Sequence, residues 1–217
     1  MQFDIITIFP LMFDSFLESS LIKKAIQKKL IKVKVHDLRK FANGNFKQVD
    51  DKPFGGGRGM VMRADVLLRA VNKIKKKNGK VVLFSPRGKQ LNQKKITKFS
   101  KIDQIIMIAG RYEGIDERVQ KYIADEVISI GNFVLMGGEI PCFVMMESVA
   151  RLIPRVIGKP EEVKKRIEKG GFIEYPQYTR PDVLEIKDKK RRVPKVLLSG
   201  HHQEIEKWRE KNSVIIE

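Results

Sequence analysis

The stretch "SIGNFVLMGGEIP" (Ser129–Pro141) marks the point where an apolar strand gives way to an unusual loop. Three glycines, Gly131, Gly137 and Gly138, bracket a short apolar patch that neither a plain strand nor a plain helix explains. Glycine adopts backbone conformations that other residues reach only at a cost, and it lets other atoms come close to the main chain. The pattern predicts that Gly131 ends a strand and that Gly137 and Gly138 approach something closely.

The flanking sequence alternates between apolar runs and helical patterns. Strands are predicted at 3–9, 32–38, 80–85, 104–110 and 126–130, and helices at 16–31, 63–77, 91–100, 115–123 and 143–153. Nearly continuous apolar strands separated by helices indicate an α/β fold, with a mostly parallel sheet and helices on both faces. Such sheets bind ligands beyond the carboxyl ends of their strands. The segments "FSPRG" (84–88), "GRYEGID" (110–116) and the opening stretch all follow strand ends.

Composition narrows the class of protein. The 217 residues, 42% of them hydrophobic, are enough for one good core and a small second domain. Cys142 is the single cysteine, which excludes an internal disulfide framework and favours a reducing compartment. No apolar run reaches the length of a membrane span, and the N-terminus lacks a basic region before its apolar stretch. We expect a soluble, cytoplasmic protein that does not enter a membrane.

The strong positive charge points to a polyanionic partner. Forty-four Lys and Arg against 26 Asp and Glu give a formal net charge of +18. An excess of this size favours nucleic acid, although basic, solvated faces would also produce it. Basic residues cluster at 73–80, 94–101 and 187–192. The first two clusters fit helix ends and loops, for which solvation is a sufficient explanation, so the third is the better RNA-facing candidate.

The character of the sequence changes after Gly158. Residues 159–172 are mostly polar, with a proline at the second position and paired glycines near the end. This composition is typical of an interdomain linker. Residues 173–217 hold few large apolar side chains, so this part should pack on another surface. We expect a first domain at 1–158, the linker, and a small helical domain at 173–217, with Ile205 and Trp208 facing inward from the last helix.

Individual motifs leave their roles open. "PFGGGRGM" (53–60) lacks the ending of a phosphate-binding P-loop, and it fits either a glycine-rich surface turn or an anion-gripping loop that includes Arg58. Glu113 fits a ligand contact or an acid in the first turn of a helix, a role for which Asp116 is better placed. The three histidines form no metal-binding pattern, so no metal site is predicted. "SGHHQEIEKW" (199–208) fits a helix start that is either purely structural or in contact with a phosphate.

Seven segments occur in an order that is more specific than any one of them: "VDDKPFGGGRGMVM", "FSPRG", "GRYEGIDERV", "ISIGNFVLMGGEIP", "VARLIP", "YTRP" and "VLLSGHH". Together they closely resemble the bacterial tRNA (guanine-N1)-methyltransferase family of the SPOUT class, from about Phe3 to Trp208. The resemblance implies that the carboxyl-end loops interweave as a deep trefoil knot that holds S-adenosylmethionine in a bent conformation. The cofactor-binding residues that it implies are Leu83, Ser85, Pro86, Gly110, Glu113, Gly114, Ser129, Ile130, Gly131, Leu135, Gly137, Gly138 and Pro141.

The resemblance also implies partners. It predicts an obligate homodimer with tRNA lying across both subunits, and a target guanine directly 3′ of the anticodon (guanosine-37). The C-terminal domain would grip the anticodon arm, and the resemblance leaves room for Mg²⁺ as a second cofactor. The insert "KDKKRR" (187–192) is an addition of a few residues relative to the family, which we expect to strengthen phosphate contact. The expected RNA-binding residues are Arg58, Arg180, Lys189, Lys190, Arg191, Arg192, Ser199, His201 and His202.

The expected reaction needs a base and a cation. A proton must leave guanine N1, and negative charge then accumulates on O6. The resemblance gives the O6 role to Arg151 in "VARLIP". Relatives place an aspartate in the linker as the base, but the matching residue here is Arg166, which cannot accept a proton at neutral pH. The candidate substitutes, with the preferred one first, are Glu168, Glu162, Glu161, Glu174 and a water molecule.

Two other functions stay open on the sequence. An arginine at position 166 fits a binding module that holds tRNA and cofactor with weak or no catalysis. A related SPOUT methyltransferase acting on ribose 2′-O or on ribosomal RNA is disfavoured by the family-specific tail. Asn132 and Met136 stand where relatives often have aspartate and serine, a departure that concerns contacts with the methionine end of the cofactor.

Overall fold

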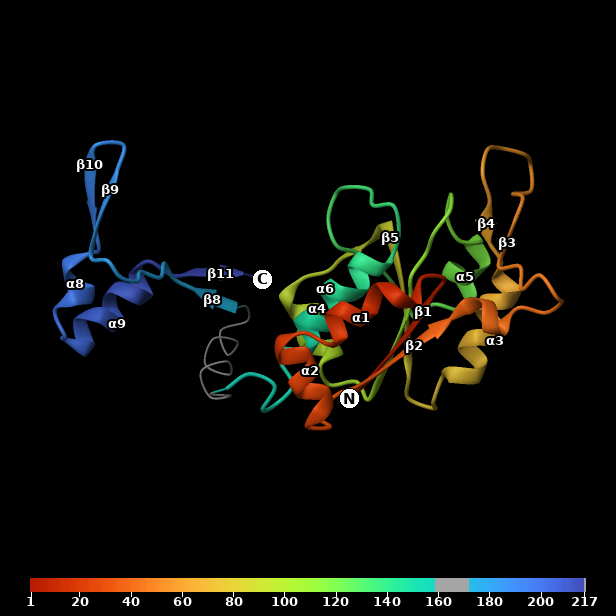
Figure 1. Cartoon of the computed structure of the whole chain (residues 1–217), viewed down its shortest axis with the longest axis horizontal. Helices are drawn as coiled ribbons and strands as arrows, with labels where there is room; N and C mark the ends of the chain where they lie inside the picture. Colours follow the sequence, from red (N-terminus) through yellow and green to blue (C-terminus); the bar gives the residue numbers. More distant parts are fainter. Residues whose placement is uncertain (159–171, 217) are drawn as a thin grey trace. The chain divides into compact units, whose positions relative to one another are not determined.

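A computed structural model describes residues 1–158 and 172–216 of the chain (Figure 1). The chain divides into two compact units, Met1–Pro160 and Glu161–Glu217. The first unit contains the parallel sheet and its covering helices, and the second contains short strands and helices.

Five parallel strands form the central sheet of the first unit. They are β1 (Gln2–Thr7), β2 (Lys32–Asp37), β5 (Lys80–Gln90), β6 (Gln104–Ile108) and β7 (Glu126–Ser129), in the spatial order β2-β1-β6-β5-β7. Every residue of β1 and β6 is buried, because both strands lie inside the sheet and helices cover both of its faces. The predicted parallel α/β sheet is confirmed.

Helices cover the two faces of this sheet in two groups (Figure 1). Phe3 and Ile5 of β1 face η1 (Pro10–Phe13), α1 (Asp14–Leu17), α2 (Ser20–Gln27), α4 (Gln93–Phe99) and α6 (Glu139–Ala150). Ile6 points to the other face, which η2 (Leu38–Phe41), α3 (Ala64–Ile74) and α5 (Glu117–Tyr122) cover. Among the described residues, no helix has both the length and the apolar character needed to cross a bilayer.

Two predicted helices differ most from the structure. The single helix expected at 16–31 is wrong, because the chain breaks between α1 and α2, and Ser20 adopts a left-handed φ of 46°. Serine is poorly suited to a helix interior, so the pair Ser19-Ser20 is a natural point of interruption. Helix α6 starts at Glu139, four residues before the expected start, because Pro141 is tolerated in a first helical turn.

The segment "FSPRG" is an excursion within β5, where a loop was expected after Leu83. Phe84 and Lys89 both align with Ile128 of β7, so the residues between them bulge out of the pairing. Pro86 lies inside the bulge, where its missing N–H costs no ladder hydrogen bond. These residues lie at the carboxyl edge of the sheet, which is where ligands of parallel sheets usually bind.

A short hairpin lies beside the sheet. Strand β3 (Asp50–Asp51) pairs antiparallel with β4 (Val61–Met62). Met62 also pairs with the segment that follows β6, since its N–H donates to the Gly114 carbonyl at 2.9 Å and its carbonyl accepts from the Asp116 N–H at 3.1 Å. The glycine-rich segment 53–60 therefore forms the tip of a hairpin whose stem is fixed to the loop after β6.

The second unit contains more strand than the expected helical domain. Strand β8 (Phe172–Glu174) pairs with β11 (Val214–Ile216), and β9 (Val183–Ile186) pairs with β10 (Lys189–Arg192). The remaining elements are α8 (Lys195–Leu198) and α9 (His202–Lys211). Lys187 and Asp188 both have positive φ angles and form the two-residue turn between β9 and β10. The basic insert is thus the turn and second strand of a hairpin, in a unit that was expected to be helical.

The second unit has little core of its own among its described residues. None of residues 174–215 is fully buried. Ile205 and Trp208 of α9 are half-buried, as their predicted inward orientation requires, and Trp208 meets Tyr178 edge-on with 6.2 Å between ring centroids. The unit depends on few apolar contacts, as its composition predicted.

Candidate cofactor and RNA site

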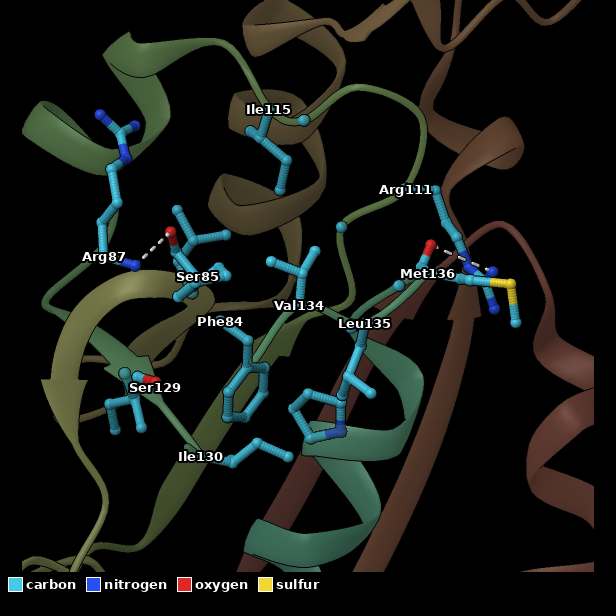
Figure 2. A pocket seen from close by; sticks show the side chains of 18 of the residues that line it. Phe84, Ser85, Arg87, Arg111, Ile115, Ser129, Ile130, Val134, Leu135 and Met136 are labelled. Carbon is cyan, nitrogen blue, oxygen red and sulfur yellow. Dashed lines mark hydrogen bonds between the residues drawn. The ribbon is translucent and has the colours of Figure 1, made fainter. Parts of the chain in front are cut away.

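A cavity of 410 Å³ opens at the carboxyl edge of the sheet (Figure 2). Three loops surround it: the β5 bulge, the segment after β6 and the segment after β7. All of the residues that the family resemblance assigned to cofactor binding line this one cavity: Leu83, Ser85, Pro86, Gly110, Glu113, Gly114, Ser129, Ile130, Gly131, Leu135, Gly137, Gly138 and Pro141. The structure therefore brings together residues as far apart in the chain as Leu83 and Pro141.

Apolar side chains form one wall of the cavity. Phe84 of β5 and both Ile130 and Leu135 of the segment after β7 point into the same space (Figure 2). Ile130 and Leu135 were expected here, whereas Phe84 was not. A flat apolar surface beside exposed main-chain groups suits a ring system that carries hydrogen-bonding edges.

Gly138, at the end of the apolar patch after β7, closely approaches another segment of the chain. A Cβ on Gly138 would lie 2.6 Å from the main-chain nitrogen of Gly110 and 2.7 Å from Cα of Ala109. The Gly138 N–H donates to the Gly110 carbonyl at 2.8 Å. The predicted close approach is confirmed, and its partner is the loop after β6. Glycine at 138 is required because the two loops touch through their backbones.

A buried ion pair fixes the same two loops. Arg111 Nε donates to Glu139 Oε2 at 2.8 Å, and the Glu139 side chain is fully buried. Thr7 Oγ1 donates to the other carboxylate oxygen at 2.8 Å. Arg111 also donates from Nη1 to the Met136 carbonyl at 3.3 Å, a bond visible in Figure 2, and its guanidinium lies 4.8 Å from the centre of the Phe9 ring. Arg111 thus holds the end of β1, the loop after β6 and the start of α6 together.

Sequence reasoning missed Arg111 and Glu139 as site residues. A usable signal was present, because a cation directly follows a buried strand in "GRYEGID" and an acid follows paired glycines in "GGEIP". Charged residues at such positions are rarely buried without a partner. Nothing in their spacing of 28 residues indicates that they pair with each other.

Asp116 and Glu113 have separate roles. Asp116 caps α5 by accepting from the Arg118 N–H at 2.9 Å, and the Arg118 side chain holds the pKa of Asp116 below its usual range. The expected helix-start role of Asp116 is confirmed. Glu113 lies outside the helix, is exposed and lines the cavity, while its N–H donates to the Met60 carbonyl at 3.0 Å.

Arg151, the cation expected to act on guanine O6, does not line this cavity. Arg151 is exposed at the C-terminal end of α6, where its N–H donates to the Glu147 carbonyl at 2.9 Å. At 1.5 Å per residue it lies roughly 15 Å along the helix from Pro141 of the cavity wall. Glu174 is half-buried in β8 of the second unit. The remaining candidates fall outside the described residues: Glu161, Glu162, Arg166 and Glu168.

The predicted RNA-binding residues share one property, which is exposure. Arg58 belongs to the β3–β4 hairpin of the first unit, and the others belong to the second unit. Lys189, Lys190, Arg191 and Arg192 make up β10, so successive side chains alternate between the two faces of the hairpin. The exposed residues in question are Arg58, Arg180, Lys189, Lys190, Arg191, Arg192, Ser199, His201 and His202.

Titratable side chains elsewhere are engaged structurally. His36 Nε2 lies 2.8 Å from Oδ1 of the buried Asp4, which also accepts from Gln2 and Gln104 at 2.7 Å each. Cys142 is buried, and burial raises the pKa of its thiol well above the usual value. In the part of the chain that the structure describes, no group of three or more His, Cys, Asp or Glu side chains is placed to hold a metal ion. The expectation of Mg²⁺ stays a prediction.

The parallel sheet and the cavity at its carboxyl edge define an α/β protein with a ligand site formed by its strand-end loops. The sequence matches the family described as "tRNA (Guanine-1)-methyltransferase TrmD" over residues 1–215. The chain therefore belongs to the tRNA (guanine-N1)-methyltransferase family, and the resemblance drawn from its motifs is confirmed.

Similar proteins share most of their length with this chain. A protein of Dictyoglomus turgidum named tRNA (guanine-N(1)-)-methyltransferase is 45% identical over 214 residues, which are 99% of this chain and 85% of the relative. A protein of the same name from Clostridium novyi is 46% identical over 217 residues, or 100% and 88% of the two chains. One from Thermus thermophilus is 44% identical over 214 residues, or 99% and 87%.

Proposed function

We propose that this chain moves a methyl group from S-adenosylmethionine to N1 of a guanine in tRNA, the guanine directly 3′ of the anticodon (guanosine-37). The observation that carries the proposal is the 410 Å³ cavity, because every residue matched to the family's cofactor pocket lines it. Family membership supports the substrate class. A reaction on tRNA with a free cofactor suits the cytoplasm.

The cavity wall has the chemistry that this cofactor needs. Its volume falls within the range of roughly 300–1,000 Å³ that is usual for small-molecule sites. Phe84, Ile130 and Leu135 offer apolar surface to an adenine ring, and main-chain groups of the glycine loops offer hydrogen bonds to its edge. The Glu113 carboxylate suits an amino group. When bound, S-adenosylmethionine supplies a methyl group that its sulfonium makes electrophilic, so no protein nucleophile is required.

The acceptor needs help from a cation. Negative charge moves to guanine O6 as the N1 proton leaves, and a guanidinium held near O6 would stabilise that charge. Arg151 is the candidate by its match to the family motif "VARLIP". Its place roughly 15 Å along α6 from the cavity wall argues against a role in the same subunit.

We therefore propose a homodimer in which Arg151 of the partner subunit serves each cavity. Ile140, Val144 and Arg151 share one exposed face of α6, since they are spaced four and seven residues apart. Beside the start of α6, the Val134 and Met136 side chains are 83% and 90% exposed. Contiguous apolar exposure of this kind is typical of a surface that another subunit covers. A second copy placed against this face would bring its own basic helix end toward the cavity.

The base that removes the N1 proton is proposed to be a glutamate of the linker. Arg166 cannot accept the proton, so a neighbouring carboxylate must take its place or the reaction must be slow. Glu168 is the first candidate and Glu162 the second, with Glu174 as the alternative from β8. Because all three are carboxylates, a rate that falls at low pH is expected whichever of them serves.

The second unit is proposed to hold the anticodon arm. Its exposed cations on β10 suit phosphate oxygens, and Ser199, His201 and His202 lie where α9 begins. Arg180 and Arg58 add further cations. These contacts would fix the register of the RNA, whereas the cavity and the target guanine define the reaction.

A single assay tests the proposal. Full-length protein is mixed with methyl-labelled S-adenosylmethionine and an unmodified tRNA transcript, and nuclease digestion then locates the label. Label on N1 of the guanine 3′ of the anticodon is the expected result. Binding of both ligands without transfer at any pH would favour the binding module suggested by Arg166. Label on a ribose would favour a different RNA methyltransferase.

A further inference from the structure

The tip of the β3–β4 hairpin presents an aromatic side chain to solvent. Phe54 is 98% exposed, and Phe46, in the preceding loop, is 97% exposed. A single exposed apolar residue needs no special explanation on its own. The surroundings of Phe54 are different, because the hairpin combines an anchored stem, a glycine-rich tip and two cations.

The stem of the hairpin is fixed to the rim of the cofactor cavity. Met60 accepts a hydrogen bond from the N–H of Glu113 at 3.0 Å, and the Met62 N–H donates to Gly114 at 2.9 Å. A Cβ on Gly59 would lie 2.5 Å from Cγ of Glu113, so the two segments are in direct contact. Since Glu113 and Gly114 line the cavity, Phe54 extends from a support that is part of the cavity rim.

The tip itself extends into open space. Gly55, Gly56 and Gly57 all have positive φ angles, and a Cβ on Gly55 or Gly56 would meet nothing within 4 Å. Glycine backbones change conformation at little steric cost. The tip can therefore adjust the position of Phe54 to a ligand that enters beside the cavity, while the stem stays in register.

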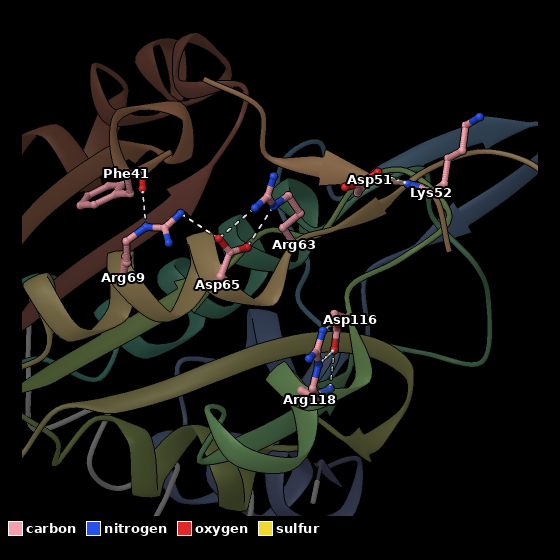
Figure 3. A network of polar contacts seen from close by, with 8 residues as sticks. All are labelled: Phe41, Asp51, Lys52, Arg63, Asp65, Arg69, Asp116 and Arg118. Atoms are coloured by element: carbon pink, nitrogen blue, oxygen red, sulfur yellow. Dashed lines mark hydrogen bonds and ion pairs between the residues drawn. The ribbon is translucent and has the colours of Figure 1, made fainter. Parts of the chain in front are cut away.

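Two cations, Lys52 and Arg58, flank Phe54 in the sequence. Neither Lys52 nor Arg58 forms an ion pair with any described residue, and Figure 3 shows the Lys52 side chain extending away from the neighbouring polar network. The nearby acids are engaged: Asp51 accepts from the Lys52 N–H at 2.8 Å, and Asp50 is hydrogen-bonded to Tyr112. An aromatic side chain between free cations is the arrangement with which proteins bind unpaired nucleotides.

We infer that Phe54 stacks on an unpaired nucleobase of the RNA substrate next to the target guanine, while Lys52 and Arg58 contact the adjoining phosphates. This inference rests on the proposed function for the identity of the RNA. It assigns to the hairpin a task separate from that of the cavity, namely to hold the neighbouring base so that the target guanine stays in place. A second copy of the chain is the competing occupant of this surface.

The test compares Phe54→Ala with Phe54→Tyr, which keeps an aromatic ring, and with the control Phe46→Ala, which removes an equally exposed phenylalanine from a different loop. The probe is an unmodified tRNA transcript with fluorescent 2-aminopurine at the nucleotide directly 3′ of the target guanine. Stacking on a neighbouring ring quenches the fluorescence of 2-aminopurine. At saturating protein, the Phe54→Ala complex should be brighter than the wild-type, Phe54→Tyr and Phe46→Ala complexes. RNA affinity should fall about 5- to 100-fold for Phe54→Ala alone.

Several results would overturn the inference. Phe54→Ala could match the wild type in brightness and affinity, or Phe46→Ala could show the same loss. Dissociation of a dimer by Phe54→Ala in analytical ultracentrifugation would assign the side chain to contact with a second copy. Unchanged binding of S-adenosylmethionine to Phe54→Ala is required, since the inference leaves the cavity intact. A wild-type chain that quenches the probe and transfers no methyl group would refute the proposed function while Phe54 kept its role.

Discussion

Arg111 and Glu139 form a 2.8 Å ion pair between the loop after β6 and the first turn of α6, and the carboxylate is fully buried. Thr7 satisfies the second carboxylate oxygen. The pair therefore ties together two of the three loops that surround the cavity. A buried charge that loses its partner is costly, so the shape of this site depends on both residues.

Replacing Arg111 with leucine should destabilise the fold and weaken cofactor binding together. Removing one partner of a buried pair typically costs about 3–5 kcal/mol in the free energy of unfolding. Urea denaturation and a titration with S-adenosylmethionine measure the two effects. The control is Arg118→Leu, which removes an exposed guanidinium from its pair with Asp116 and should have a much smaller effect on both measurements. Equal effects of the two substitutions would contradict the structural role of Arg111.

Gly138→Ala should separate the two loops that touch through their backbones. The new methyl group would lie 2.6 Å from the Gly110 nitrogen, and no flexible side chain is available to move aside. Overpacking of this kind typically costs about 1–3 kcal/mol. Thermal unfolding should show the loss, whereas the control Gly158→Ala, whose added Cβ meets nothing within 4 Å, should melt like the wild type. A Gly138→Ala protein as stable as the wild type would contradict the account.

Asp4 should give the protein a stability contribution that disappears in acid. Burial raises the pKa of Asp4, but hydrogen bonds from His36, Gln104 and Gln2 outweigh burial and hold the pKa below its ordinary 3.8. A carboxyl group with a lowered folded-state pKa stabilises the fold above its unfolded pKa, and this stabilisation is lost as the pH falls through the folded-state value. The free energy of unfolding of the wild type should therefore exceed that of Asp4→Asn by a constant amount above about pH 5. This difference should shrink below about pH 4.

Urea unfolding of both proteins between pH 7 and pH 3 measures this difference. Asp14→Asn, an exposed carboxyl group of the same unit, serves as the control and should leave the pH profile unchanged. If the difference in unfolding free energy between the wild type and Asp4→Asn were equal at pH 7 and pH 3, the stabilisation by the hydrogen bonds around Asp4 would not depend on its charge.

The two faces of the β9–β10 hairpin should contribute unequally to RNA binding. Lys189 and Arg191 lie opposite Ile186 and Leu184, whereas Lys190 on the other face lies opposite Glu185. The Glu185 charge partly neutralises that second face. Lys189→Gln with Arg191→Gln should therefore reduce the slope of log affinity against log salt by up to about 2, and more than an equal charge change on the other face does.

Filter binding of unmodified tRNA at several salt concentrations provides these slopes. Lys190→Gln with Arg192→Gln is the matched pair, since it removes the same formal charge from the same strand. Equally reduced slopes for the two double variants would show that both faces of the hairpin contribute alike. If both variants kept the wild-type slope, the hairpin would not contact the RNA.

If the cavity of one subunit is completed by Arg151 of the other, mixed dimers should regain activity. A chain with Gly138→Val would have a defective cavity and a good Arg151, and a chain with Arg151→Ala would have the reverse. Each should be inactive alone. After co-refolding, half of the dimers are mixed and each has one intact composite site, so methyl transfer should return to about a quarter of the wild-type level. No recovery would mean that Arg151 acts in its own subunit or does not act at all.

The regular part of the fold could be predicted from the sequence for a physical reason. Strands such as β1 and β6 are buried on both faces, so they require uninterrupted apolar residues, and this requirement is visible in single runs such as "FDIITIF". The cavity could be located because parallel strands place their carboxyl ends at one edge. The amphipathic helix α3, expected at 63–77, is present at Ala64–Ile74.

Features that depend on tertiary contacts could not be predicted. The pairing of Arg111 with Glu139, the β5 bulge and the contact of Gly59 with Glu113 join segments that lie far apart in sequence. The left-handed Ser20 interrupts a pattern whose apolar spacing is helical throughout. The hairpin formed by the basic insert was missed because its second strand, "KKRR", has none of the β-branched or aromatic residues that usually indicate a strand.

The central claim is that three strand-end loops form one site for S-adenosylmethionine. Calorimetric titration of the full-length protein with this compound tests it most directly. We predict a saturable heat of binding with one molecule per chain, and weaker binding by Gly138→Ala than by Gly158→Ala. No detectable heat up to about 1 mM, where the binding free energy would be weaker than about 4 kcal/mol, would contradict the account.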